Sequence, residues 1–386
     1  MIKKQRAVSA AKSETVVSRR KFLKGAAAVG TGAAAIGFPM IAKAQAPITL
    51  RFQSTWPTKD IFHEYALDYA KKVNEMTGGR LKIEVLPAGA VVKAFDMIEA
   101  VHKGILDGGH GVAAYWYGRH PAYSLFGTSP GFGMDANMLL AWVYYGGGLE
   151  LYNELQHKIM NFDLVGFLYG PMPTQPFGWF KKEIKSVDDM KTIKFRTVGL
   201  AVDNYKEFTA SVVALPGGEI VSALDRGLID AAEFNNASSD RALGFQDVAK
   251  HCYLQSYHQP LECFEILFNK KKYDALPTDI KSIIKYAVEA AHADMSWKAL
   301  DRYSQDYIEL QTKDKVNFHI TPKDILEAQL KAWDVVIKRK SDENPFFAKV
   351  IESQKAWAKR VAGWGLDTIV SPTPAYTHFF GKRALS

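Results

Sequence analysis

Cysteine is nearly absent from this sequence, since only Cys252 and Cys263 occur among 386 residues. Neither belongs to a Cys-x-x-Cys pair or to a Cys/His cluster, which excludes a disulfide-framed mini-protein, a structural zinc site and covalent haem attachment. In an oxidising compartment the two thiols could form a bridge. They could equally remain two buried free thiols, and the sequence leaves this choice open.

An excess of charge of one sign is absent from most of the chain. The formal net charge of +8 comes from residues 1–44, which hold nine of the 49 Lys/Arg residues and one of the 41 Asp/Glu residues. The remaining 342 residues carry 40 of each kind. A neutral body provides no field for DNA or RNA, so we expect no nucleic-acid partner. The composition, 47% hydrophobic and 23% charged, is that of a folded globular chain and excludes a disordered one.

Long apolar runs are also absent, except near the N-terminus. There the segment Ser18-Arg19-Arg20-Lys21 precedes 18 uncharged residues, which end at Ala42-Lys43-Ala44. This order predicts an export signal over residues 1–44 with cleavage near Ala44, and the paired arginines resemble the signal of the Tat system. The alternative is an N-terminal membrane anchor, which four glycines and a proline in the run disfavour. We therefore expect a mature chain that is soluble and periplasmic.

Several common enzyme motifs are missing as well: the sequence contains no GxxxxGK[ST] or HExxH, and no GxGxxG after a strand. His63, His110 and His258 lie near turns that could line a cleft, but a lone histidine is more often a satisfied polar residue than a base. Nothing assembles a nucleophile, a base and an oxyanion site. We expect a protein that is not an enzyme. A Tat-exported periplasmic enzyme acting on a small organic acid remains the alternative, because Tat export often serves cofactor-loaded redox proteins.

What the sequence does contain is an α/β pattern with an internal repeat. A strand from Ile48, a helix capped by Asp60 and a strand over residues 81–85 predict the start of a parallel layer. A second helix is expected over residues 91–103. Residues 100–107 (AVHKGILD) match residues 223–230 (ALDRGLID) in class at seven of eight positions. Two copies of helix, glycine cap and short strand predict two similar α/β lobes, whereas a solenoid needs about three or more units.

The C-terminal part reads as helical. Residues 278–316 contain neither glycine nor proline, which allows a helix of about 30–35 residues that could span both lobes. A short strand over residues 316–320 and two further helices, from Pro322 and from Asn344, are expected next. The fold predicted is α/β, with two similar lobes of mixed sheets, a ligand cleft between them, a long spanning helix and a helical C-terminus. The expected division is lobe 1 at 45–165 with a returning segment at about 257–280, lobe 2 at 166–256, and the spanning helix with the C-terminal helices at 281–386.

Polar side chains at strand ends mark the candidate site. Arg196 ends a short strand over residues 192–196, and Glu233-Phe234-Asn235-Asn236 follows the second copy of the repeat. In open α/β layers ligands gather beyond the carboxyl ends of strands. The planar fork of an arginine matches a carboxylate with two parallel bonds. An ordinary structural ion pair would place the same residues there, so both interpretations stay open.

Several segments in order resemble one known family. They are the Tat-like leader, residues 100–110 (AVHKGILDGGH), Trp142 with Gly146–Gly148, residues 175–180 (QPFGWF), residues 193–196 (IKFR) and residues 227–233 (GLIDAAE). Together they look like the periplasmic solute-binding subunits of TRAP transporters, a periplasmic binding protein type, over about residues 47–365. More narrowly they resemble the branch that binds 2-oxo acids, lactate and related monocarboxylates.

The resemblance implies a set of site residues. Arg196 falls where the family's arginine clamps the substrate carboxylate. Gln175, Glu233, the backbone carbonyl of Phe234 and Gln259 fall where this branch holds a cation, and oxygen ligands suit Na⁺ or Ca²⁺. Trp56, Tyr115 and Phe132 would face the acid, with Tyr115 as the hydroxyl donor. The expected partners are a small organic acid, the TRAP membrane subunits and, through the C-terminal helices, a second copy of the chain; no organic cofactor is expected.

Overall fold

The structure is a computed structural model that describes residues 46–209, 211–383 and 385. The predicted export signal lies outside these residues. From Ala46 onward the chain forms a single compact unit. Its first elements are as the sequence predicts. Strand β1 (Ile48–Ser54) is followed by helix α2 (Ile61–Met76), and the Asp60 side chain caps this helix by accepting the Phe62 N–H at 3.1 Å.

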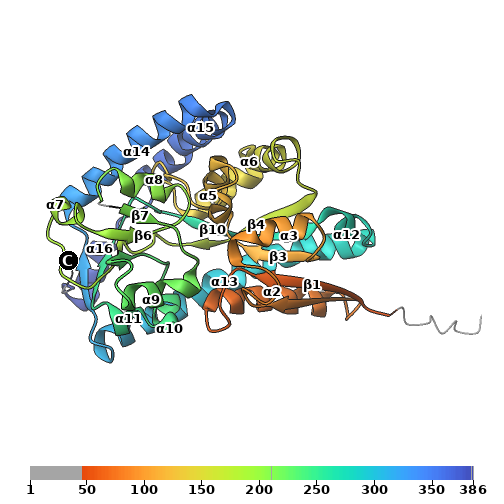
Figure 1. The fold of residues 1–386 in the computed structure, drawn as a ribbon, viewed down its shortest axis with the longest axis horizontal. Coiled ribbons are helices and arrows are strands. Elements are labelled where there is room, and N and C mark those ends of the chain that lie inside the picture. The colour runs from red at the N-terminus through yellow and green to blue at the C-terminus, as the bar shows by residue number, and fades with distance from the viewer. Residues whose placement is uncertain (1–45, 210, 384, 386) are drawn as a thin grey trace, which may run out of the picture. The chain divides into compact units, whose positions relative to one another are not determined.

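The strands of the described residues form two mixed sheets (Figure 1). The strand order of the first sheet is β2 (Leu81–Leu86), β1, β3 (Gly108–Gly111), β10 (Glu262–Asn269) and β4 (Leu164–Met172). Strand β1 pairs in parallel with β2 and β3, and β10 runs antiparallel to β3 and β4. Strand β10 is buried along its whole length, which places it at the centre of the core.

The second sheet repeats this arrangement with shorter strands. Its strand order is β11 (Asn317–Ile320), β9 (His251–Leu254), β5 (Gly178–Phe180), β8 (Ala231–Ala232), β6 (Lys194–Arg196) and β7 (Ser211–Val213). Strand β6 pairs in parallel with β7 and β8, and β5 runs antiparallel to β8 and β9. Two mixed sheets confirm the predicted fold class.

The internal repeat performs the same structural task in each sheet. Helix α3 (Met97–His102) and helix α9 (Gly217–Asp225) each end before a left-handed glycine, Gly104 with φ +72° and Gly227 with φ +71°. Three residues later an aspartate accepts a backbone N–H from the neighbouring strand. Asp107 Oδ2 receives Arg51 N at 2.8 Å, and Asp230 Oδ2 receives Lys194 N at 2.9 Å. The repeat is therefore structural, although the short strand expected within each copy begins only after it, at Gly108 and at Ala231.

The long helix is present as predicted. Helix α13 (Thr278–Thr312) has 35 residues and packs against α2 and β4 beside the first sheet and against α10 (Ala237–Leu243) beside the second. Figure 1 shows it between these elements. The chain then ends in three further helices: α14 (Lys323–Glu343), α15 (Pro345–Thr368) and α16 (Pro372–Phe380). None of the helices in the described part of the chain is long and apolar enough to cross a membrane.

Shorter helices complete the layers around the two sheets. They are α4 (Ser124–Gly127), α5 (Ala136–Tyr145), α6 (Gly148–Glu154), α7 (Val187–Met190), α8 (Ala201–Lys206), α11 (Phe245–Val248) and α12 (Lys270–Asp274). The two cysteines are buried and free, Cys252 on β9 and Cys263 on β10, so they lie in different sheets. The structure thus has two buried thiols in place of a bridge.

The chain passes between the sheets at three places. Residues 173–177 connect β4 to β5, residues 255–261 connect β9 to β10, and the segment with α13 connects β10 to β11. The predicted lobe boundaries near residues 165 and 256 remain predictions. Strand β4 extends past the first of them to Met172 and still belongs to the first sheet.

Candidate functional site

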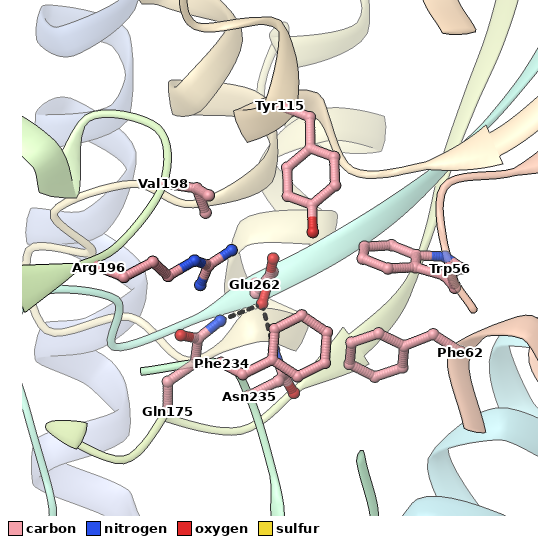
Figure 2. A pocket seen from close by; sticks show the side chains of 9 residues that line it. All are labelled: Trp56, Phe62, Tyr115, Gln175, Arg196, Val198, Phe234, Asn235 and Glu262. Carbon is pink, nitrogen blue, oxygen red and sulfur yellow. Dashed lines mark hydrogen bonds between the residues drawn. The ribbon is translucent and has the colours of Figure 1, made fainter. Parts of the chain in front are cut away.

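A small cavity lies where side chains from both sheets meet (Figure 2). Trp56 follows β1, Tyr115 belongs to the short 3₁₀ helix after β3, Arg196 ends β6 and Phe234 follows β8. The site is thus at the carboxyl ends of parallel strands from two sheets, as the α/β rule expects. Its lining consists of Trp56, Phe62, Tyr115, Gln175, Arg196, Val198, Phe234, Asn235 and Glu262. The free space among them is only about 10 Å³, room for about one water molecule, so an acid can occupy the site only if its walls move apart.

The guanidinium group of Arg196 is fully buried and makes four hydrogen bonds. Its Nε and Nη2 donate to the Leu215 carbonyl at 2.8 and 2.5 Å. Its Nη1 donates to the backbone carbonyl of Glu233 at 2.8 Å and to Glu233 Oε1 at 3.0 Å. Arg196 is therefore held rigidly, with Glu233 as its carboxylate partner.

Glu233 is the carboxyl that completes this buried pair. Burial raises the pKa of Glu233 to about 7, although Arg196 and the Thr197 hydroxyl act in the opposite direction. Its second oxygen, Oε2, makes no hydrogen bond of normal geometry. Burying an ion pair whose remaining lone pairs are unsatisfied is unfavourable, so this oxygen is available to another partner.

Glu262 is a site residue that the sequence did not reveal. It begins β10, which returns to the first sheet from far along the chain, and Gln175 Nε2 donates to its Oε2 at 2.5 Å. Asn235 Nδ2 donates to the same oxygen (Figure 2). Burial raises the pKa of Glu262 to about 8, and the negative charge of Glu233 adds to this. Only the antiparallel pairing of β10 brings Glu262 to the cavity, and no local sequence motif predicts that pairing.

Several buried oxygens around the cavity have no hydrogen-bond partner. Three of them belong to side chains expected to hold a cation: Gln175 Oε1, Glu233 Oε2 and Gln259 Oε1. Of these residues only Gln175 lines the cavity, while Glu233 is bonded to Arg196 and the Gln259 backbone to that of Gln175. The Tyr115 hydroxyl is also without a partner, and so is Gln259 Nε2. Buried polar atoms are nearly always satisfied, so a cluster of orphaned ones marks a place for a bound group. Oxygen-rich, largely neutral donors of this kind fit a hard cation.

No metal site of the usual type competes with this one. In the described residues no group of three or more His, Cys, Asp or Glu side chains is arranged to hold a metal ion. The set around Gln175 differs from such a group because its donors are mainly amide oxygens. Gln175 and Gln259 are also joined directly, through the Gln175 N–H and the Gln259 carbonyl at 3.2 Å.

The predicted aromatic residues separate into two groups. Trp56 and Tyr115 line the cavity with their ring centroids 5.3 Å apart, and Phe234 lies 6.4 Å from Trp56. Phe132 is not among the lining residues. Its ring lies 5.9 Å from the Lys355 ammonium group, so the structure does not bring it together with the others. Phe62 from α2 and Val198 after β6 take places on the wall that the sequence did not assign.

The three histidines near the cleft are buried and bonded to neighbours. His63 Nδ1 pairs with Ser54 Oγ at 2.7 Å, and His258 Nδ1 pairs with Ser256 Oγ at 2.5 Å. His110 contacts both Trp56 and Tyr169. None of the three lines the cavity. The contacts of His63 and His110 agree with their interpretation as satisfied polar residues, whereas His258 Nε2 is buried without a partner.

A two-sheet α/β fold that closes charged and aromatic side chains around a small cavity defines a class, the solute-binding proteins. Residues 52–342 match the family "Bacterial extracellular solute-binding protein, family 7". That match spans most of the chain, so the chain belongs to this family. The family is one of solute-binding receptors, as the resemblance in the sequence indicated.

Known relatives extend this result. A monocarboxylate 2-oxoacid-binding periplasmic protein from Nostoc sp. (strain PCC 7120) is 34% identical over 317 residues, which cover 81% of this chain and 85% of that protein. A TRAP periplasmic solute-binding protein from Colwellia psychrerythraea, solved with bound calcium and pyruvate, is 30% identical with a TM-score of 0.77 and covers 83% of this chain and 97% of its own. A TRAP periplasmic solute-binding protein from Pseudoalteromonas atlantica T6c, solved with bound sodium and pyruvate, is 30% identical with a TM-score of 0.78. The match covers 86% of this chain and 99% of that protein.

Proposed function

We propose that this protein is a periplasmic carrier that captures a small 2-oxo monocarboxylate together with a cation and delivers it to TRAP membrane subunits. The observation that carries the proposal is the group of orphaned buried oxygens beside Arg196. Relatives that bind pyruvate with calcium or sodium support the same ligand class.

The cation would be held by Gln175, Glu233, Gln259 and the backbone carbonyl of Phe234. Glu262 lies against Gln175 and adds a second carboxyl to this neighbourhood. Once bound, the cation supplies positive charge that offsets the repulsion between Glu233 and an incoming carboxylate. Two carboxyls favour a divalent ion more than one does, so the structure makes Ca²⁺ a stronger candidate than the sequence alone did.

Arg196 would bind the acid only by changing partners. An arginine has five N–H donors, and four hydrogen bonds already engage this one. A ligand carboxylate could take a two-bond grip if Glu233 gave up its contact with Nη1. A cation that takes over Glu233 makes this exchange favourable, which is the physical reason for coupling the ion to the acid.

We further propose that the protein carries out no chemistry on its ligand and that it leaves the cytoplasm through the Arg19-Arg20 signal. The C-terminal helices provide a surface for a second copy of the chain. There Leu366, Val370 and Phe380 are 85%, 86% and 75% exposed, and covering them would remove apolar area from water.

The test is calorimetric titration of purified protein with pyruvate, 2-oxobutyrate and lactate, in buffers with Na⁺, with Ca²⁺ and with chelator. We expect binding of at least one 2-oxo acid, tighter with a cation present, and recovery of the ligand unchanged. At a hundredfold excess over Kd the ligand should also raise the free energy of unfolding by about 2.7 kcal/mol. Turnover of the acid would favour the enzyme alternative, and equal affinity in all buffers would contradict the cation site.

A further inference from the structure

The orientation of Trp56 is fixed by a buried chain of hydrogen bonds outside the cavity. Its indole Nε1 donates to His110 Nδ1 at 3.0 Å, and His110 Nε2 lies 2.6 Å from the Tyr169 hydroxyl. All three side chains are at most 1% exposed. Figure 2 shows the indole nitrogen on the side of Trp56 that faces away from Arg196.

This contact determines which ring nitrogen of His110 carries a proton. An indole N–H can only donate, so His110 Nδ1 must accept and cannot be protonated. The proton of the neutral ring then sits on Nε2, where it is donated to Tyr169. A doubly protonated ring would set two donors against each other. Burial also disfavours the doubly protonated ring, because it lowers the pKa of His110 to about 3.

The consequence for the cavity is a largely apolar wall. The only polar group of Trp56 is used outside the cavity, and the rings beside it are those of Phe62 at 4.9 Å, Tyr115 at 5.3 Å and Phe234 at 6.4 Å, so the Tyr115 hydroxyl is the polar group nearest to this wall. Arg196, Gln175 and Glu262 gather on the other side of the cavity (Figure 2). An acid whose carboxylate lies at Arg196 would direct its far end toward the aromatic wall.

We propose that His110 is a positioning residue that keeps the Trp56 N–H out of the cavity, so that the site selects 2-oxo acids with a hydrocarbon end over acids of equal size with a hydroxyl there. The inference rests on the proposed function for its ligand. The Tyr115 hydroxyl is the expected donor to the oxygens of the acid itself, so a further hydroxyl on the ligand would have no partner at this wall, whereas a methyl group would fit.

The test compares 2-oxobutyrate with 3-hydroxypyruvate, which differ by a terminal methyl or hydroxyl group. We expect the unmodified protein to prefer 2-oxobutyrate by about tenfold or more, the scale set by an unpaired buried hydroxyl. His110→Leu removes the acceptor and should abolish most of this preference. His110→Asn places an oxygen near the position of Nδ1 and should restore it. His63→Asn is the matched control, because it changes a neighbouring buried histidine that does not contact the Trp56 side chain.

A second measurement does not depend on any variant folding. In ¹⁵N-labelled protein, the His110 ring should show the neutral Nε2–H form at every pH from about 5 to 8. An Nδ1–H form, or an unchanged preference in His110→Leu, would overturn the proposal. If neither acid binds at all, the proposed function fails and the selectivity fails with it, while the His110 tautomer still decides whether this residue orients Trp56.

Discussion

At the scale of single residues, the charge at the centre of the site is already balanced within the protein. Arg196 and Glu233 neutralise each other at 3.0 Å with both side chains fully buried. Any acid that binds must therefore replace one half of an existing pair. Substitutions of Arg196 and of Glu233 should therefore have different effects on acid affinity and on stability.

Arg196→Lys should weaken acid binding about tenfold or more, since a lysine has no planar fork and a charge-assisted hydrogen bond is worth about 1.5–3 kcal/mol. Loss of the two contacts with the Leu215 carbonyl should also lower the melting temperature. Titration calorimetry and thermal unfolding measure the two effects. Unchanged affinity together with a lower melting temperature would make Arg196 a purely structural residue.

Glu233→Gln should mainly lower the stability of the ligand-free protein rather than its affinity for the acid. Removing one partner of a buried pair leaves Arg196 uncompensated, so the ligand-free protein should lose about 3–5 kcal/mol of unfolding free energy. An acid would then supply the missing carboxylate and raise the melting temperature more than in the unmodified protein. Na⁺ and Ca²⁺ should no longer change acid affinity. Glu219→Gln, an exposed position on α9, is the control and should change neither quantity.

At the scale of elements, the two copies of the repeat should respond alike to the same change. Gly104 and Gly227 both have left-handed φ, where a side chain costs about 1–2 kcal/mol. A Cβ at Gly227 meets nothing within 4 Å, and one at Gly104 meets only Asn269 at 3.7 Å. Alanine at either position should therefore destabilise by strain alone and by similar amounts.

Gly363→Ala provides the control for this pair. It lies inside helix α15 at ordinary helical φ with open space around it, so alanine there should stabilise by about 1 kcal/mol. Urea unfolding of the three variants gives the comparison. If Gly104→Ala and Gly227→Ala changed the unfolding free energy in opposite directions, the two copies of the repeat would not be equivalent.

How far the sequence predicts an element depends on where its partners lie. Helix α2 has its cap and its buried face within sixteen residues and was predicted closely. The helix expected over residues 91–103 is α helical only from Met97, because the Gln53 side chain on β1 accepts the N–H groups of Val91 and Val92 and donates to the Val92 carbonyl. That contact spans about forty positions and leaves no local pattern.

The same distinction explains the candidate site. Arg196 and Glu233 stand at the ends of predictable strands, so residue type and position indicate them. Glu262 reaches the cavity only through the antiparallel pairing of β10 with β3 and β4. Phe132 was placed by resemblance alone, and its turn with φ +51° carries it toward Lys355.

At the scale of the whole molecule, buried carboxyls should make stability depend on pH. Burial raises the pKa of Asp60 to about 6, of Glu233, Asp240 and Glu265 to about 7 and of Glu262 to about 8. Below about pH 6.5 buried histidines such as His110 and His258, whose pKa burial lowers to about 3, act in the opposite direction, because the unfolded chain then binds extra protons. Between about pH 7 and 8 the folded state thus holds more protons than the unfolded chain, and its unfolding free energy should fall as pH rises through this range. Each unit of pKa shift corresponds to about 1.4 kcal/mol.

Thermal unfolding from pH 7 to pH 8, with and without Ca²⁺, checks this expectation. A bound cation favours the ionised carboxyls, so Ca²⁺ should flatten the fall with pH. Glu265→Gln, which lies outside the cavity lining, should reduce the fall equally with and without the ion. A melting temperature that rises from pH 7 to pH 8 in chelator would contradict the assignment of these groups.

The crossings between the sheets have a mechanical consequence. Gln175 and Gln259 lie in two of the three segments that join the sheets, and a backbone hydrogen bond ties these segments together. If the sheets swing apart, points on this pivot move least, while Trp56 and Phe234 on opposite sheets separate most. An ion seated at the pivot would keep those two ligands in the open and in the closed form. The aromatic wall, in contrast, would be complete only after closure, so the ion can be in place before the acid arrives.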